Sequence, residues 1–193
     1  MIKNKMPKWD EVGLIVFDFD GIFTNNKVFV NNNGEEYVCC SRADGLAFDI
    51  LRKFINLNKW KLRYLILSKE ENSVVSCRAK KLSIPCFNGI HDKLSFLKEY
   101  IKNENLNLNS ISNKFIYLGN DLNDLSSIEM SDFSIAPKDA HPIILKSVDL
   151  VLPFDGGNGF VRNFIERLLQ MDQMSKKNLM QINYAMILSF LDS

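Results

Sequence analysis

The apolar positions of the chain fall into short runs that alternate with helical patterns. Residues 12–19 are almost continuously apolar and mostly β-branched or aromatic, which is typical of a strand buried on both faces. Similar runs lie at 62–67 and 115–118, and shorter ones at 133–136 and 150–152 are expected to be edge strands. Helical spacing appears at 45–54, 72–82 and 93–101. This alternation predicts an α/β domain with a doubly wound, Rossmann-like parallel sheet.

One segment, residues 27–40, breaks this alternation. Its two short apolar stretches flank Asn33-Gly34, a pair of residues that strongly favours a tight hairpin turn. We therefore expect a β-hairpin inserted directly after the first strand. Farther along, the stretch "FDGGNGFVRNFIERLL" predicts a glycine-rich bend and a helix that begins near Gly159.

The chain length fits one domain followed by a tail. With 193 residues, of which 46% are hydrophobic, the chain can bury one core. We assign residues 1–170 to the domain and residues 171–193 to a C-terminal tail. Helical spacing of apolar residues predicts that the tail is a helix packed on itself or on a partner; these residues are Leu179, Ile182, Met186 and Phe190.

The charge balance narrows the classes of partner. The 24 basic residues nearly equal the 23 acidic ones, so no electrostatic feature favours nucleic acid or a membrane surface. No apolar run approaches the ~18 residues that cross a bilayer, and the first residues lack the apolar centre of a signal peptide. We expect a cytoplasmic protein. The four cysteines show no C-x-x-C spacing, which favours reduced thiols over a zinc site or disulfides.

Polar residues with reactive or ligating side chains follow the predicted strands. In a parallel sheet the carboxyl ends of the strands share one crevice, so residues far apart in sequence meet there. The group contains several acids, one hydroxyl and one lysine, and this set suits Mg²⁺ and a phosphoryl group. One carboxylate can attack phosphorus while a second transfers protons. The residues are Asp18, Asp20, Ser68, Lys93, Asn120, Asp121 and Asp124.

These residues stand in sequences that resemble a known family. "DFDGIFT", the serine after "LIL", the lysine of "HDK" and "GNDLND" match, in order, the four motifs of the haloacid dehalogenase superfamily of phosphatases. "SRADGLAFDILR", "RAKKLSIPCFNGIHDK" and "APKDAHP" are similar to its small cap-less branch. That branch hydrolyses 3-deoxy-D-manno-octulosonate 8-phosphate and nonulosonate 9-phosphates. The resemblance covers residues 10–170.

The resemblance implies a role for each motif residue. Asp18 would be the nucleophile and a metal ligand. Asp20 would be the general acid and base, and would give its backbone carbonyl to Mg²⁺. Ser68 and Lys93 would bind the phosphoryl oxygens, and Asp124 would hold the waters of the metal or orient Lys93. Since Asp18 must be ionised while Asp20 carries a proton, we expect their pKa values to be pushed apart.

The chain departs from the family at the third metal ligand. The family usually has an acid directly after the glycine of the last motif, where this chain has Asn120. Either the amide oxygen of Asn120 binds as a neutral ligand, or Asp121 turns inward to replace it.

Further residues would bind the sugar. "LSKEENSVVSCRAKKL" resembles the nonulosonate side of the branch, which implies that Glu70, Arg78 and Lys81 meet a sugar acid, with the two basic residues binding its carboxylate. Arg42 and Asp44 would line the substrate entrance near the hairpin. From the residues alone, Arg78 and Lys81 are equally compatible with a solvated helix face, and Glu70 with an acid at a helix N-terminus.

The resemblance implies a Mg²⁺-dependent phosphatase. It would remove the terminal phosphate from a 2-keto-3-deoxy sugar acid, through an aspartyl-phosphate, in the biosynthesis of surface glycans. Because no cap insert is present to shield the site, shielding would have to come from another subunit, and the hairpin is the natural contact between subunits. The resemblance implies that the assembly is a homotetramer.

Two alternatives stay open at this point. One is a non-catalytic oligomerisation module, similar to the phosphatase-like domain of some cytidylyltransferases, which Asn120 would favour. The other is a phosphoacceptor signalling domain, although such domains are shorter and place the phosphorylated acid on a later strand.

Overall fold

A six-stranded parallel sheet forms the centre of the protein. The computed structural model describes residues 5–108 and 113–188, with side chains described as far as residue 182. Within them the strand order is β5-β4-β1-β6-β7-β8, so the chain winds outward from β1 to one edge and then from β6 to the other. This confirms the predicted fold class. The strands are β1 (Val12–Phe17), β4 (Arg63–Leu67), β5 (Cys86–Phe87), β6 (Lys114–Leu118), β7 (Phe133–Pro137) and β8 (Leu150–Leu152).

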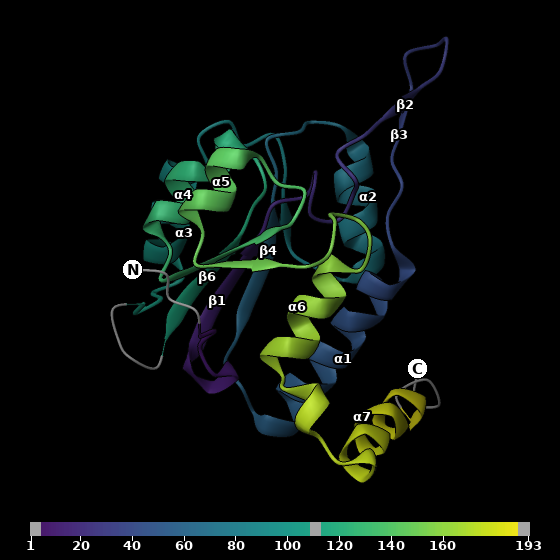
Figure 1. The fold of residues 1–193 in the computed structure, drawn as a ribbon, viewed down its shortest axis with the longest axis vertical. Coiled ribbons are helices and arrows are strands. Elements are labelled where there is room, and N and C mark those ends of the chain that lie inside the picture. The colour runs from purple at the N-terminus through teal and green to yellow at the C-terminus, as the bar shows by residue number, and fades with distance from the viewer. Residues whose placement is uncertain (1–4, 109–112, 189–193) are drawn as a thin grey trace.

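Helices cover both faces of the sheet (Figure 1). Leu14 and Val16 of β1 face one apolar cluster and Ile15 and Phe17 the other, so β1 is buried on both faces as predicted. One face is covered by α1 (Arg42–Asn58), α2 (Ser73–Leu82) and α6 (Phe160–Leu168), and the other by α3 (Lys93–Asn103), α4 (Leu125–Met130) and α5 (Pro142–Ser147). The described residues also form short 3₁₀ helices, namely η1 (Trp9–Glu11), η2 (Leu122–Asp124) and η3 (Met171–Gln173).

Several boundaries differ from the sequence prediction. The strand β7 is not an edge strand, since it lies between β6 and β8. The edge opposite β8 is formed by β5, whose two residues are too few to show the alternation of a strand. Helices α4 and α5 have six residues each, too few to show helical spacing. Helix α1 begins three residues early because the Ser41 hydroxyl caps it, accepting from the backbone N–H of Ala43 at 3.1 Å.

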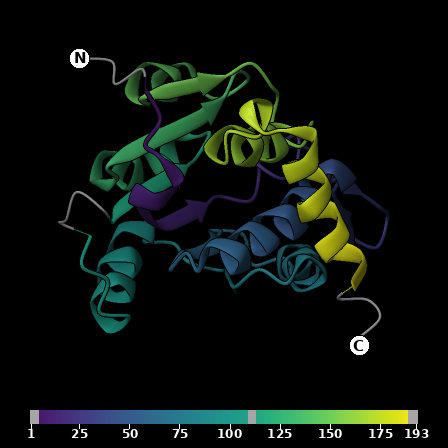
Figure 2. The same ribbon diagram turned by 90° about the horizontal axis from the view of Figure 1, so that it is seen from below.

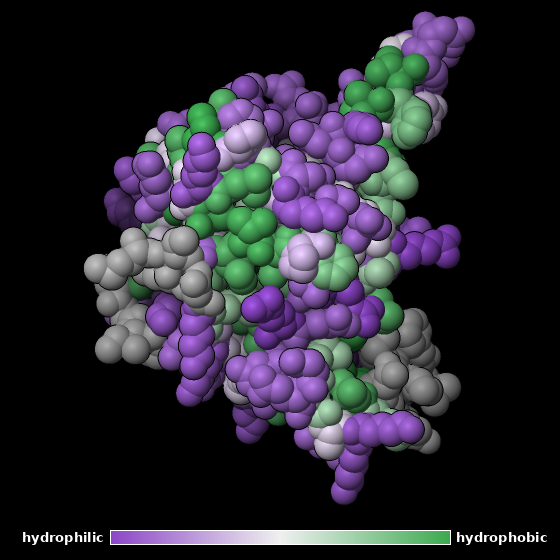
Figure 3. Space-filling model, viewed as in Figure 1, coloured by the Kyte–Doolittle hydropathy of each residue, from purple (hydrophilic) through white to green (hydrophobic). Residues whose placement is uncertain are grey.

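The predicted hairpin follows β1, with strands β2 (Phe29–Val30) and β3 (Glu36–Tyr37). Its turn spans the three residues 32–34, because Asn31 Oδ1 accepts from the backbone N–H groups of Asn33 (2.9 Å) and Glu35 (3.0 Å). Gly34 takes the left-handed conformation that ends such a loop, with φ of +80°. The hairpin projects from the domain and exposes apolar side chains (Figure 3), namely Val28, Phe29, Val30 and Tyr37.

Residues 176–188 of the tail form helix α7 (Lys176–Leu188), which packs against α1 (Figures 1 and 2). Ile182 is 6% exposed and joins the core beneath α1, while Leu179 is half-buried. The side chain of Met186 and all of Phe190 lie outside the described residues. The division of the chain at residue 170 stays a prediction. None of the helices in the described part is both long and apolar enough to cross a membrane.

Candidate active site

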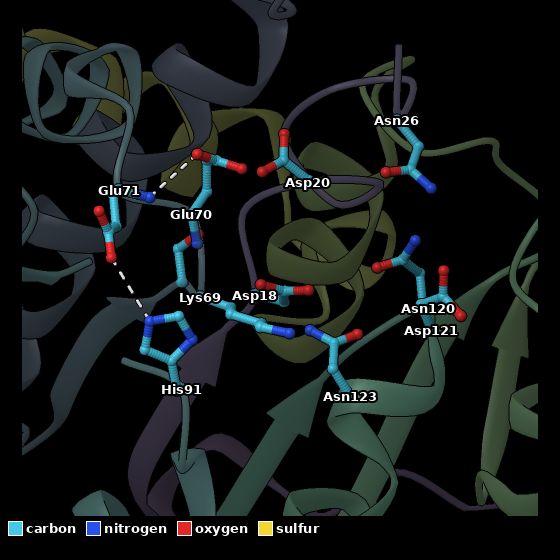
Figure 4. Close-up of a pocket in the computed structure, with 11 residues that line it drawn as sticks. Asp18, Asp20, Asn26, Lys69, Glu70, Glu71, His91, Asn120, Asp121 and Asn123 are labelled. Atoms are coloured by element: carbon cyan, nitrogen blue, oxygen red, sulfur yellow. Dashed lines mark hydrogen bonds and ion pairs between the residues drawn. The ribbon is translucent and has the colours of Figure 1, made fainter. Parts of the chain in front are cut away.

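Loops at the carboxyl end of the sheet enclose a pocket of about 460 Å³ (Figure 4). Asp18 and Asp20 reach it from the loop after β1, Ser68 from the loop after β4, and Asn120 from the loop after β6. These strands lie on either side of the point where the winding of the sheet reverses, the usual ligand position in such folds. The lining residues are Asp18, Asp20, Asn26, Ser68, Lys69, Glu70, Glu71, His91, Asn120, Asp121 and Asn123.

The turn after β1 holds its two acids in place. The backbone N–H of Asp18 donates to the carbonyl of Leu118 at 2.9 Å, which extends the β1–β6 pairing by one residue. Gly21 then reverses the chain with φ of +76°. The Thr24 hydroxyl accepts from the N–H of Gly21 (3.2 Å) and donates to Asp20 Oδ1 (3.3 Å). Both carboxylates therefore enter the pocket from a fixed turn.

A buried lysine joins Asp18 to a second carboxylate. Lys93 is the first residue of α3, is 3% exposed, and places its Nζ 2.8 Å from both Asp18 Oδ1 and Asp124 Oδ1. Asp124 also accepts from the Tyr117 hydroxyl (2.7 Å) and from the backbone N–H groups of Asn120 (2.9 Å) and Asp121 (3.3 Å). With four donors on its two oxygens, Asp124 is placed to orient Lys93 rather than to hold metal-bound waters.

Ser68 presents a hydroxyl to the same pocket. The residue is 1% exposed, and its Oγ accepts from the backbone N–H of Glu70 at 3.1 Å. Within the described residues the hydroxyl hydrogen has no acceptor, so it can donate to an oxygen of a ligand.

Asn120 supplies an oxygen that lacks a partner. Its Oδ1 is buried and accepts no hydrogen bond from the described residues, an arrangement that costs about 1–3 kcal/mol unless a donor or cation is present. Its amide nitrogen packs against Gly21, where a Cβ atom would lie only 1.9 Å away. Figure 4 shows the oxygen pointing toward Asp18 and Asp20. Asp121 instead accepts from the backbone N–H of Leu122 (2.7 Å) and caps η2.

These oxygens fit a divalent cation. The Asp18 carboxylate, the Asp20 backbone carbonyl and the Asn120 amide oxygen are hard ligands of the kind that Mg²⁺ prefers. Throughout residues 5–108 and 113–182, no three His, Cys, Asp or Glu side chains converge as a metal site. The arrangement at the strand ends thus has an amide oxygen where a further carboxylate would otherwise be needed.

Burial changes the acidity of both carboxyl groups. Burial, together with the nearby Asp124 carboxylate, raises the pKa of Asp18 to about 8 despite the Lys93 ammonium. Burial also raises the pKa of Asp20, against the hydrogen bond from Thr24. Both pKa values therefore rise, and that of Asp18 does not stay low as expected. The physical reason is that Asp18 and Asp124 share a single buried ammonium, which leaves one negative charge unbalanced.

The predicted sugar-binding residues separate into two places. Glu70 lines the pocket, and its Oε1 accepts from the backbone N–H groups of Glu71 (3.0 Å) and Asn72 (3.2 Å), so it caps the turn before α2. Arg42, Arg78 and Lys81 lie in a second groove of about 400 Å³ between α1 and α2.

Asp44 lies in neither place. It is 1% exposed, and its Oδ1 accepts from the backbone N–H of Arg162 at 2.9 Å, which ties α1 to α6. Arg78 is turned toward α1, where its Nη2 donates to the Ser41 carbonyl at 2.9 Å. In the single chain, therefore, Arg42 and Asp44 do not line the pocket as expected, and Arg78 and Lys81 do not reach it to bind a sugar carboxylate. Spacing along a helix does not reveal which neighbour each side chain meets.

The pocket also contains residues that the sequence reasoning missed. Lys69 directly follows Ser68 at the end of β4, and Asn123 precedes Asp124 in the loop after β6. Their position at strand ends was the available sequence signal. At the rim, His91 lies 3.4 Å from Glu71 in an exposed pair.

Comparison with known proteins gives the family. No family model matches the chain. A crystal structure from Streptomyces avermitilis, described as that of a HAD (haloacid dehalogenase) family hydrolase, is 32% identical, covers 90% of this chain and 95% of its own, and superposes with a TM-score of 0.78. The chain belongs to the haloacid dehalogenase superfamily.

Other relatives in this superfamily are phosphatases. The 3-deoxy-D-manno-octulosonate 8-phosphate phosphatase KdsC of Salmonella typhi is 27% identical over 165 residues, which are 85% of this chain and 82% of that protein. The corresponding phosphatase of Moraxella catarrhalis, solved with a magnesium ion, a phosphate ion and a KDO molecule, is 26% identical, covers 84% of this chain and 88% of its own, and has a TM-score of 0.73. The chain is thus a phosphoric monoester hydrolase.

Proposed function

We propose that the chain removes the terminal phosphate from a 2-keto-3-deoxy sugar acid, with Mg²⁺, in the biosynthesis of surface glycans. The central observation is that Asp18, held 2.8 Å from Lys93, enters the same pocket as Asp20 and the unpartnered oxygen of Asn120. The similarity to octulosonate 8-phosphate phosphatases supports this class of substrate, and a nonulosonate 9-phosphate is the related candidate. A non-catalytic module would not need this arrangement.

The metal would be held by Asp18, the backbone carbonyl of Asp20 and Asn120. Asp121 is the weaker candidate, because its carboxylate already caps η2. Mg²⁺ bound there would polarise the phosphoryl group and offset the negative charge that the acids concentrate.

In the first step, a carboxylate oxygen of Asp18 attacks phosphorus. The bond between phosphorus and the sugar oxygen breaks, and its electron pair stays on that oxygen, which takes a proton from Asp20. The raised pKa of Asp20 suits this donor role, and the Thr24 hydroxyl holds its carboxyl group in position. The products of this step are the free sugar acid and an aspartyl-phosphate on Asp18.

In the second step, Asp20 accepts a proton from a water molecule that attacks the phosphorus of the aspartyl-phosphate. The bond to Asp18 breaks, inorganic phosphate leaves, and Asp20 is protonated again for the next turnover. Lys93 and the Ser68 hydroxyl are placed to donate hydrogen bonds to the phosphoryl oxygens in both steps.

Of the residues expected to bind the sugar, Glu70 alone lines the described pocket of a single chain. The pocket volume lies in the range of small-molecule sites, and Glu70 offers a carboxylate to sugar hydroxyl groups. A substrate role for Arg42, Asp44, Arg78 and Lys81 stays a prediction. For the three basic residues it would require the α1–α2 groove to face the pocket of another copy.

A homotetramer built on the hairpin is part of the proposal. The Phe29 and Val30 side chains are 67% and 60% exposed on β2, and contact with other copies would bury them. Sedimentation of Phe29→Ser should show dissociation, whereas Ile143→Ser, which removes an exposed apolar side chain from α5, should keep the assembly. A wild-type chain that sediments as a monomer would contradict the tetramer.

Release of phosphate tests the proposed activity. The purified chain should hydrolyse an aryl phosphate in Mg²⁺ and lose this activity in a chelator. A panel of octulosonate 8-phosphate, nonulosonate 9-phosphates and common sugar phosphates without a carboxylate then tests the substrate class. Equal activity on the sugar phosphates that lack a carboxylate would contradict the sugar-acid assignment.

A further inference from the structure

Lys69 is a lysine of the pocket to which the catalytic scheme gives no role. It follows Ser68 directly, its side chain is exposed, and it lines the pocket. In the view of Figure 4 the side chain extends past Asp18, and its ammonium points toward Asn123 on the other side of the pocket. In the part of the chain that the structure describes, no hydrogen bond or ion pair engages its ammonium group.

The pocket is acidic, so an additional ammonium group would favour the binding of an anion there. Five carboxylates line the pocket, and Lys69 is the single lysine among the described lining residues. The other lysine at the site, Lys93, lies behind Asp18 and already donates to Asp18 and Asp124. A phosphomonoester brings about two further negative charges near neutral pH, so its binding requires positive charge beyond that of Lys93 and a divalent cation.

The position of the side chain identifies which part of the substrate it meets. If Asp18 attacks phosphorus, the phosphoryl group must lie directly against the Asp18 carboxylate, in the pocket that Lys69 also lines. In the view of Figure 4 the Lys69 ammonium ends near this carboxylate. A lysine has a flexible stem and three donors, so it can follow the phosphoryl group as the ester becomes inorganic phosphate.

We propose that Lys69 binds the phosphoryl group of the substrate, as a second ammonium that lines the pocket in addition to the buried Lys93. This inference rests on the proposed function, because the phosphoryl position follows from attack by Asp18. Lys69 would act in binding the substrate and in retaining phosphate, whereas Lys93 and Asp124 form the rigid part of the site.

Titration of inorganic phosphate into the Mg²⁺-loaded chain tests this without turnover. Calorimetry should show that Lys69→Met weakens phosphate binding about 10-fold, the effect of losing one charge-assisted hydrogen bond at an exposed position. Lys69→Arg should restore most of the affinity. Lys80→Met, which removes an exposed lysine of α2 outside the pocket, should leave the affinity unchanged. The difference between Lys69→Met and wild type should shrink in high salt, because an exposed ammonium is screened.

Steady-state kinetics separate phosphoryl binding from other roles. For Lys69→Met, KM should rise by a similar factor for an aryl phosphate and for a sugar-acid phosphate, as should the inhibition constant of phosphate. A change confined to the sugar acid would mean that Lys69 binds the carboxylate and would overturn the proposal. A lower Mg²⁺ requirement with unchanged phosphate affinity would overturn it too, since Lys69 would then only compete with the cation.

The two proposals can fail separately. If the wild-type chain hydrolyses none of the phosphates, the proposed function fails, but the phosphate titration still reports on Lys69. If the chain is active and Lys69→Met binds phosphate as the wild type does, the role of Lys69 fails alone.

Discussion

The pocket at the strand ends and the groove between α1 and α2 differ in how their charges are held. In the pocket, Asp18, Lys93 and Asp124 are buried and fixed by contacts of 2.8 Å. In the groove, cations predominate on a partly exposed surface, and Arg52 forms the single ion pair among its described residues, with Asp49. The comparison indicates that the buried charges at the pocket are held in fixed positions, whereas most cations of the groove are left without an ion-pair partner among the described residues.

The largest expected effect comes from the buried nucleophile. Asp18→Asn keeps the size of the side chain but removes the attacking carboxylate, so kcat should fall by about 10⁴-fold or more. Asp49→Asn makes the same chemical change in the groove and should leave hydrolysis of an aryl phosphate unchanged. Initial rates with an aryl phosphate and Mg²⁺ measure both variants. Equal losses would remove the distinction between the two regions.

A lysine in each region gives the next contrast. Lys93→Met leaves Asp18 and Asp124 buried without their cation, so the free energy of unfolding should fall by about 3–5 kcal/mol and kcat by about 10²–10³-fold. Lys81→Met removes an exposed lysine, and its unfolding free energy should change by less than about 1 kcal/mol. Urea unfolding in a chelator measures stability independently of activity.

Asn120 tests the proposed metal ligands. Asn120→Asp adds a negative charge beside Asp18 and Asp20, so the Mg²⁺ concentration for half-maximal activity should fall about 10-fold. Asn120→Ala removes the unpartnered oxygen and should raise that concentration. If Asn120→Ala has no effect and Asp121→Ala does, Asp121 is the third ligand.

A smaller contrast concerns the groove itself. Arg78→Met should leave hydrolysis of an aryl phosphate within about twofold, because Arg78 contacts α1 and not the pocket. The same variant assayed with a sugar-acid phosphate sharpens the comparison. A raised KM for this substrate alone would place the groove beside the pocket of another copy.

The last contrast concerns the pH dependence of stability, which Asp44 affects from outside both regions. Burial raises the pKa of Asp44 to about 6 from an ordinary value of 3.8, so the folded chain binds the proton more tightly than the unfolded chain. Stability from this group is therefore greatest below about pH 4 and declines as pH rises to about 6, by at most about 3 kcal/mol. Asp44→Asn keeps an acceptor for Arg162 and should flatten this decline. Urea titrations at several pH values in a chelator measure the slope, and an unchanged slope would mean that Asp44 is ionised in both states.

The sequence revealed the pocket better than the groove for a physical reason. A strand fixes where its last residue points, so Asp18, Ser68 and Asn120 could be placed together from the order of strands alone. On a helix each residue turns by about 100°, and the side that faces a neighbour depends on packing that spacing does not record. The resemblance gave Arg78 a role in binding the sugar acid, and the sequence could not show that its side chain contacts Ser41 in the single chain. The role of Lys69 needed the structure, because a lysine after a strand is ordinary until its neighbours are known.

The aspartyl-phosphate is the most direct test of the proposed mechanism. The Mg²⁺-loaded chain is mixed with a sugar-acid phosphate, quenched rapidly in acid, digested, and its peptides are weighed by mass spectrometry. The account predicts one phosphoryl group on the peptide that contains Asp18 in the wild type and none in Asp18→Asn. Full turnover with no phosphorylated peptide, or a phosphoryl group on another residue, would contradict it.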